Sequence, residues 1–586
     1  MFLTVLMGLA FIFSPGTPAA PGVSFAGFDP VEADVRTVPW STLQRLALEA
    51  GLFPPVYRPV SEGELSNLLE KALDEAMSGD AAAFRDDEEL ARLQWWLDRY
   101  RRSGGGHAWY GCDCKVHPPQ LRLSGRVAAG FTDLGSPLDQ EAGLAWSPGW
   151  NATFEPILDF SAGPWWVSAT ARLTGQVAAA GVDFSGPGAD QSPLTWPDWS
   201  IPTGKSQVRD ARLQGGRWIL DVPRLVAGVN WGRWSLSAGW APRRTGPGLT
   251  GALAMDQSGV SFPAVTVRRM EPFVWGSGFL NFFAPDELLL ATGRLSERLV
   301  RYGDAEGVLH EKTDHPWFFQ WLIGWRVTSW FRATFTHVAM AVPREGTLWG
   351  DILQINFPIK GTTWSETTHG PVTDRIFSAQ LEGRWRHAPW PVLPSSAGRL
   401  YWDYAGTDFL PSGPGGAIPQ ISVPASVIGL EMVGPVWDLG LEYTELVHED
   451  VLWYSNSGFP EGYSHEGWLL GHTLGGSGES FSGQVRIRPG GWGLESGLRV
   501  RHATWGMEKR TPGTGEMNTV ALSVKNLPSA SVGGSLTEGP PPAPLLWEIT
   551  LEWNQEEADS GAFTEGSPPG SRQEKNWWRA YFKLGI

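Results

Sequence analysis

The stretch Trp437-Asp438-Leu439-Gly440-Leu441-Glu442-Tyr443-Thr444 decides the fold class of this chain. Its large apolar side chains alternate with polar or small ones, so an extended strand would have one apolar and one polar face. The same period of two recurs at 234–240, 377–385, 481–488 and 547–553, often with tryptophan at the end of the apolar face. The pattern predicts antiparallel strands with one apolar face.

Two features favour a transmembrane barrel over a soluble sheet. Tryptophan and tyrosine gather at the ends of the apolar faces, the level of the lipid headgroups. The segments are about 9–11 residues long, the length that a tilted strand needs to cross a bilayer. Only a closed barrel satisfies every backbone group of such strands in lipid. The alternative is a secreted β-sandwich or β-propeller, although no repeat of about 40–50 residues supports a propeller.

Candidate strands from about residue 119 to the end of the chain number roughly 16–20, and an even number near 18 is expected. The last stretch, residues 577–586, alternates and carries aromatic residues, so it is predicted to close the barrel on the first strand. The fold class is therefore all-β: a large antiparallel transmembrane barrel preceded by a small helical region.

The composition excludes other classes of protein. The chain has 586 residues, a net charge of −16, 33 tryptophans and 18% charged residues, against roughly 25% in soluble domains. A nucleic-acid-binding protein would need a basic face. A hydrophobic content of 42% with so few charges excludes a largely disordered chain.

The N-terminal region predicts export followed by a short helical unit. Residues 2–13 form an apolar run too short for a spanning helix, so residues 1–26 are predicted to be a signal peptide. A buried N-terminal segment is the alternative. Helices are expected at 41–50, after the Ser61–Glu64 capping box, and at about 86–102. The predicted domains are the signal peptide, a periplasmic helical region with its linker at 27–115, and the outer-membrane barrel at 116–586.

Several motifs, taken in order, resemble the Wzi family of outer-membrane capsule assembly proteins over most of the chain. The first segment runs through Glu442-Tyr443-Thr444, Trp453-Tyr454, Gly462-Tyr463 and Gly471-His472. The second contains residues 230–234 (Asn-Trp-Gly-Arg-Trp), Gly246-Pro247-Gly248 and the basic Val267-Arg268-Arg269. The departures are Cys112 and Cys114 in the linker, a presumed long loop rich in glycine and proline at 403–424, and the proline-rich 539–544.

The resemblance implies an outer-membrane barrel that acts as a lectin and holds capsular or related polysaccharide at the cell surface. Its implied partners are this acidic polysaccharide, outer-membrane lipid and polysaccharide export machinery. Members of the family bind and do not catalyse, so no cofactor is expected. The alternatives are a passive porin-like channel and, less favoured, an outer-membrane hydrolase.

Arginines that alternate with apolar residues are the first candidate binding residues. A charge facing lipid near the midplane costs about 2–4 kcal/mol, so these arginines are expected to face the interior. A guanidinium group binds carboxylate with two parallel hydrogen bonds, as an acidic polysaccharide requires. The alternative is a structural ladder with Glu382, Glu442, Glu495, Glu548 and Glu552. The candidates of this kind are Arg233, Arg384, Arg486, Arg488 and Arg499, and the basic stretch of the resemblance adds Arg268 and Arg269.

Aromatic residues between strands are the second candidates. Trp453, Tyr454, Phe459 and Tyr463 could form a platform on which sugar rings stack, or they could serve as membrane anchors or pack the loop. No catalytic motif stands out: His448-Glu449-Asp450 and residues 461–466 lack the His-Glu-x-x-His spacing. No Gly-x-Ser-x-Gly elbow occurs in a strand–helix context. Cys112 and Cys114 lack the spaced partners of a zinc site.

Overall fold

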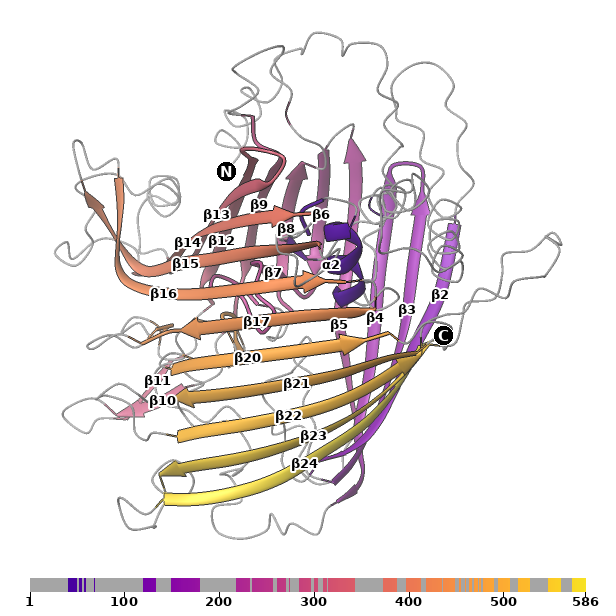
Figure 1. Ribbon diagram of the computed structural model, residues 1–586. Helices are drawn as coiled ribbons and strands as arrows, with labels where there is room; N and C mark the ends of the chain where they lie inside the picture. Colours follow the sequence, from indigo (N-terminus) through magenta and orange to yellow (C-terminus); the bar gives the residue numbers. More distant parts are fainter. Residues whose placement is uncertain are drawn as a thin grey trace.

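A computed structural model of the chain consists of one closed barrel of antiparallel strands with chain segments folded into its interior (Figure 1). The residues that the structure describes are 40–49, 52–54, 57–58, 68, 120–132, 149–179, 218–231, 234–256, 261–269, 273, 284–296, 300–303, 309–312, 315–342, 372–386, 397–412, 418–434, 436–447, 453–454, 459, 463–465, 468–472, 474–475, 478–488, 494–505, 515–526, 546–559 and 572–585.

Eighteen strands form the barrel, and each pairs with its neighbour along the chain. The last strand pairs with the first, for example Phe582 with Ala129, which closes the sheet. The strands are β2 (Gln120–Thr132), β3 (Gly149–Ala162), β4 (Trp165–Ala179), β5 (Trp218–Trp231), β6 (Trp234–Trp240), β8 (Pro263–Arg269), β9 (Glu287–Arg294), β12 (Trp317–Arg326), β13 (Phe331–Val342), β14 (Val372–Trp385), β15 (Ala397–Ser412), β16 (Ile418–Val433), β17 (Trp437–Glu445), β20 (Gly478–Ile487), β21 (Leu494–Trp505), β22 (Gly515–Asn526), β23 (Leu546–Asp559) and β24 (Arg572–Gly585). The prediction of an antiparallel barrel with about 18 strands is confirmed.

The lengths of the connections orient the barrel. Two-residue connections join β3 to β4 and β5 to β6, and they lie at the same end as the C-terminus of β24. A longer connection, 38 residues between Ala179 of β4 and Trp218 of β5, joins strand ends at the other end of the barrel. Outer-membrane barrels have short periplasmic turns and longer extracellular loops. The end with the short connections is therefore the periplasmic end.

The helix α2 (Trp40–Glu49) lies at the end with the short connections, beside β15 and β16 (Figure 1). Its Leu48 packs against Ala397 and Val433, at the start of β15 and the end of β16. The predicted helix at 41–50 is confirmed to within one residue. The other two predicted helices lie largely, and the signal peptide and the cysteine pair entirely, outside the described residues. No helix among the described residues is both long and apolar enough to span a membrane.

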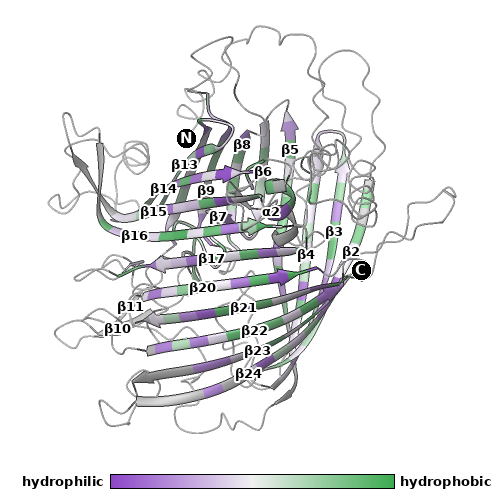
Figure 2. Ribbon diagram, viewed as in Figure 1, coloured by the Kyte–Doolittle hydropathy of each residue, from purple (hydrophilic) through white to green (hydrophobic). Residues whose placement is uncertain are grey.

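The outer face of the barrel is apolar, as the alternation predicted. Apolar and polar residues follow one another along the strands (Figure 2). On β22 and β23 the exposed side chains are Leu522, Val524, Ile549 and Leu551, while the side chains between them point inward. The apolar surface ends toward the extracellular side at a row of outward positions on adjacent strands. That row comprises Glu445, Glu479, Thr504 and Glu516. Carboxylates are too costly to lie in hydrocarbon, so this row marks the headgroup level.

An arginine placed on this outer face tests the membrane assignment. Leu522→Arg is expected to lower the free energy of unfolding from liposomes by about 2–4 kcal/mol, because residue 522 lies amid the apolar rows. Asn518→Arg, on the same strand and the same face but one row from the carboxylates, is expected to change it by about 0–1 kcal/mol. Equal effects of the two substitutions would argue that the face is not in lipid.

The prediction of a long loop at 403–424 is wrong, because most of these residues belong to strands. Residues 403–412 belong to β15 and residues 418–424 to β16, and the two strands form an extended hairpin. Pro411, Pro419 and Pro424 lie where each strand has a partner on one side only, because β15 pairs with β14 only up to Thr407 and β16 pairs with β17 only from Ser426. A proline lacks an N–H and is tolerated at such an edge. The strand lengths range from 7 to 16 residues, wider than the predicted range of about 9–11.

Candidate functional site

Two chain segments fold into the barrel and fill much of its interior. The first, residues 241–256, follows β6, and the second comprises the described residues of 453–475, between β17 and β20. Leu253 and Trp453 are both fully buried. They belong to one apolar cluster with inward-facing wall residues such as Phe318 and Val338. The interior on this side of the barrel is therefore a packed core.

Short strand pairs give the inward segments regular structure. In the first segment, β7 (Arg244–Thr245) pairs with β1 (Tyr57–Arg58), which comes from the N-terminal region. In the second segment, β18 (Ser464–His465) pairs with β19 (Trp468–Leu469). The pairing satisfies backbone groups that are buried away from water.

Two tyrosines of the second segment hold the first. The hydroxyl of Tyr454 donates to the Leu253 carbonyl, and that of Tyr463 to the Ala254 carbonyl, both at 2.9 Å. The two rings stack with centroids 5.9 Å apart. Tyr454 adopts a φ of +60°, a conformation that costs a non-glycine residue about 1–3 kcal/mol. Its hydroxyl also accepts from the His472 N–H at 2.9 Å. The Tyr454 side chain therefore contacts both the first inward segment and a later part of its own segment.

Two glycines permit close packing of the inward segments, Gly251 between the two segments and Gly471 within the second. A Cβ atom on Gly251 would lie 2.3 Å from the His472 ring, and one on Gly471 would lie 2.3 Å from the Tyr454 ring. Both distances are too short for non-bonded carbon atoms. A side chain at residue 251 would force the two segments apart, and one at residue 471 would disrupt the packing within the second segment.

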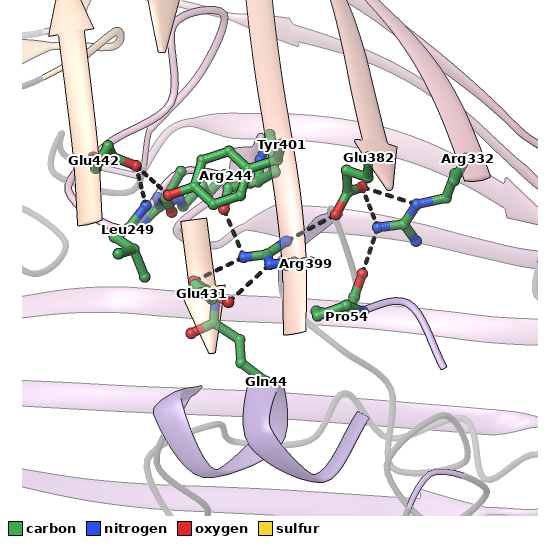
Figure 3. A network of polar contacts seen from close by, with 12 residues as sticks. Gln44, Pro54, Arg244, Leu249, Arg332, Glu382, Arg399, Tyr401, Glu431 and Glu442 are labelled. Carbon is green, nitrogen blue, oxygen red and sulfur yellow. Dashed lines mark hydrogen bonds and ion pairs between the residues drawn. The ribbon is translucent and has the colours of Figure 1, made fainter. Parts of the chain in front are cut away.

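Glu442 on β17 anchors the first segment to the wall. Its carboxylate accepts hydrogen bonds from the backbone N–H groups of Leu249, at 2.5 Å, and Thr250, at 2.9 Å. The Thr250 hydroxyl also donates to it, and the Tyr401 hydroxyl donates at 2.7 Å (Figure 3). A carboxylate holds several donors at once, and hydrogen bonds to a charged group are the strong ones.

Arg399 on β15 is the centre of a buried network of charges (Figure 3). It is 1% exposed and contacts Glu431 and Glu382 at 2.8 Å each. It also donates to the Pro247 carbonyl of the first inward segment at 2.8 Å. Arg399 therefore joins the carboxylates of the two neighbouring strands to the inward segment.

The same network reaches the N-terminal region. Gln44 on α2 donates to Glu431 at 3.3 Å. Arg332 on β13 pairs with Glu382 and donates to the Pro54 carbonyl at 2.6 Å. The helix, the wall and the inward segment are thus joined by one chain of polar contacts.

Most of the predicted arginines face the interior and contact carboxylates. Arg488 and Arg486 lie 2.5 Å and 3.9 Å from Asp438. Arg499 lies 3.5 Å from Glu552, and Arg268 lies 3.4 Å from Glu287. These contacts agree with the alternative interpretation, in which the arginines pair with carboxylates on other strands and do not bind a ligand. A role in binding polysaccharide stays a prediction.

The other predicted arginines pack against aromatic rings. Arg384 lies 4.8 Å from the Phe53 ring centroid. Arg269 lies 5.4 Å from the Trp234 ring and 3.8 Å from the Phe273 ring, and strand alternation puts it on the outer face with Val265. Arg269 is therefore on the outer surface of the barrel and not on the interior wall. Arg233 lies outside the described residues.

The predicted aromatic residues are buried. Trp453, Tyr454, Phe459 and Tyr463 are at most 1% exposed and belong to the interior cluster. Of the interpretations given above for these residues, loop packing describes their position. Protein atoms cover their rings in this structure, so a sugar has no ring face on which to stack.

Sequence reasoning missed Arg399 and Arg332 as central residues. Arg399, Tyr401 and Asp403 do alternate with Leu400, Trp402 and Tyr404, a signal of the kind used elsewhere. The nearby prolines concealed it, because they suggested a loop. Within the described ranges, no three His, Cys, Asp or Glu side chains gather as a metal site requires.

Buried histidines make the packing of the interior dependent on pH. Burial lowers the pKa of His465 from 6.5 to about 4, and burial with nearby Arg501 and Arg244 lowers the pKa of His472. Both are neutral when folded, so the unfolded segment binds protons more readily below pH 6.5. Stability is expected to be full above that pH and to decrease as the pH falls toward 4.

This expectation is measured by hydrogen exchange of residues 463–472, corrected for intrinsic rates. For His465 alone the loss is about 2 kcal/mol at pH 5 relative to pH 7.5. His465→Gln, which keeps an acceptor for the Ser296 N–H, should remove that share of the loss. The expectation fails if the segment is equally protected at both pH values.

These features define a class: a closed outer-membrane-type barrel whose interior is occupied by its own chain. No family model matches the sequence. No curated protein matches it either. Among solved structures it is similar to Wzi of Escherichia coli, described as an outer membrane protein involved in group 1 capsule assembly and a carbohydrate-binding β-barrel. The TM-score is 0.55 at 13% identity, covering 96% of this chain and 99% of that one. The chain has the fold of that barrel.

Two other similar structures are less close. Acinetobacter baumannii OccAB2 has a TM-score of 0.44 at 9% identity, covering 81% of this chain and 99% of that one. The outer membrane protein opdK of Pseudomonas aeruginosa has a TM-score of 0.39 at 11% identity, covering 80% and 99%.

Proposed function

We propose that this chain is an outer-membrane protein that binds an acidic capsular or exopolysaccharide and attaches it to the cell surface. The proposal includes no catalytic step. Export by a signal peptide at residues 1–26 and a periplasmic position for residues 27–115 are part of it. The fold shared with E. coli Wzi, a carbohydrate-binding barrel, supports the choice of ligand class.

The observation that carries the proposal is the occupied interior. A barrel of 18 strands is wide enough for an aqueous channel. Here, residues 241–256 and the second inward segment pack together and against the wall. Glu442 and Arg399 bind the first segment by hydrogen bonds. Such contacts favour a protein that holds a ligand over one through which solutes diffuse.

Deletion of the gene in its native host tests the proposal. Cell-bound polysaccharide should decrease and polysaccharide in the medium should increase by the same amount, because synthesis continues without attachment. A plasmid copy of the wild-type gene should restore the cell-bound fraction. Unchanged retention after deletion would refute attachment, and a loss of total polysaccharide would point to a role in synthesis or export.

A further inference from the structure

The interior wall made by β20 to β24 differs from the wall that holds the inward segments. On β14 to β17, Arg399, Glu382 and Glu442 are at most 2% exposed. On β21, by contrast, the Arg499 side chain is 36% exposed, and Lys525 on β22 is 16% exposed. This second wall therefore has charged groups within reach of a ligand.

Strand register arranges the inward side chains of β21 to β24 in three adjacent rows. The upper row is Arg499, Ala521, Glu552 and Arg579. The middle row is Gly497, Ser523, Thr550 and Tyr581. The lower row, nearest the periplasm, is Glu495, Lys525, Glu548 and Lys583. Small side chains thus lie between two rows of long charged ones, with one aromatic ring at the end.

The charges of these rows favour an anion. Among the twelve residues of the rows there are four cations, Arg499, Arg579, Lys525 and Lys583, against three carboxylates. Glu552 is shared, since Arg579 lies 2.7 Å from its Oε2 atom and Arg499 lies 3.5 Å from the same atom. The closer arginine is 9% exposed and the farther one 36%. Arg499 is therefore the one more available to a ligand.

Tyr581 supplies the apolar part of such a site. Its ring is partly exposed, and Arg579 and Lys583 lie over it, 5.3 Å and 5.0 Å from its centroid. An aromatic ring offers an apolar face to the C–H groups of a sugar and a polar hydroxyl at its edge. Cations beside it would hold a carboxylate on the same sugar by charge-assisted hydrogen bonds.

We infer that the middle row and its flanking cations form a binding site for a sugar that carries a carboxylate, that is, a uronic acid unit of a polysaccharide. The exposed part of Tyr581 contacts the sugar, and Arg499 and Lys583 bind the carboxylate. The inference rests on the proposed function and adds to it the ligand's chemical class and the residues that bind it.

Titration calorimetry of the purified, full-length protein in detergent tests the site. The probe is hexagalacturonate, and its methyl ester, in which the carboxylates are neutralised, is the control ligand. The wild type should bind the acid at least about tenfold more tightly than the ester. Arg499→Gln with Lys583→Gln should weaken binding of the acid at least about tenfold. Glu552 keeps Arg579 in this variant.

Matched variants separate the site from general effects on the protein. Tyr581→Leu should weaken binding, while Tyr581→Phe should retain it because the ring remains. Arg326→Gln removes an arginine that is 47% exposed and lies 3.2 Å from Asp286 at a different place on the wall, and it should bind as the wild type does. A circular dichroism spectrum that matches that of the wild type shows that each variant is folded.

The results also separate the site from the proposed function. If the wild type does not bind hexagalacturonate, or if the double variant binds it as tightly as the wild type, the inference is overturned. Release of polysaccharide on gene deletion would still support attachment in either case, through another surface. Loss of binding in the double variant, but not in Arg326→Gln, supports the site.

Discussion

Replacement of Arg399 by leucine is expected to lower the free energy of unfolding by about 3–5 kcal/mol, the largest effect of any single substitution proposed for this protein. The change leaves Glu382 and Glu431 buried without the cation that both contact at 2.8 Å. It also removes the donor to the Pro247 carbonyl, which ties the first inward segment to the wall. A buried charge without its partner keeps the full penalty of desolvation.

Urea unfolding of the protein in liposomes measures this loss. Arg399→Lys keeps the charge but not the planar set of donors, so it should recover only part of the stability. Arg326→Leu is the control, because its ion pair with Asp286 is half exposed and should be worth about 0–1 kcal/mol. A loss below about 1 kcal/mol for Arg399→Leu would show that Glu382 and Glu431 reach water or another cation.

Removal of both inward segments should convert the barrel into a conducting channel. Replacing residues 244–256 and 453–475 by short glycine-serine linkers deletes the side chains that fill the interior beside β12 to β17. The strands themselves would keep their pairing, since the barrel ladder does not use these residues. In planar bilayers, the wild type is expected to show little or no conductance, and the double deletion steady channels of porin size.

The control is removal of the hairpin formed by β10 (Val300–Gly303) and β11 (Leu309–Lys312), which among the described strands form a two-stranded sheet apart from the barrel. This variant should conduct as little as the wild type. Steady conductance in the wild type would contradict the occupied interior and favour a passive channel. A silent double deletion would mean that other parts of the chain also block the barrel.

The sequence by itself determined the barrel. Alternation along stretches such as 437–444 and 547–553 assigns each side chain to one of two faces, because the period of a strand is two. That local rule predicted that Leu441 and Ile549 would face outward and that Glu442 and Glu552 would face inward, as they do. The helix at 41–50 followed from equally local signals. The misread stretch at 403–424 failed because a proline's effect depends on whether a neighbouring strand needs its N–H, which is not local.

Only the tertiary structure decided what the interior contains. Alternation puts Arg399 inward but cannot reveal that Glu382 and Glu431, on neighbouring strands, would share it. Nor does it say that Tyr454 and Tyr463 would turn into the lumen and bind the carbonyls of residues some two hundred positions earlier. Such contacts depend on strand register and on the path of segments that have no period. The residues of such a segment show no sequence pattern that distinguishes a loop projecting outward from one packed inside the barrel.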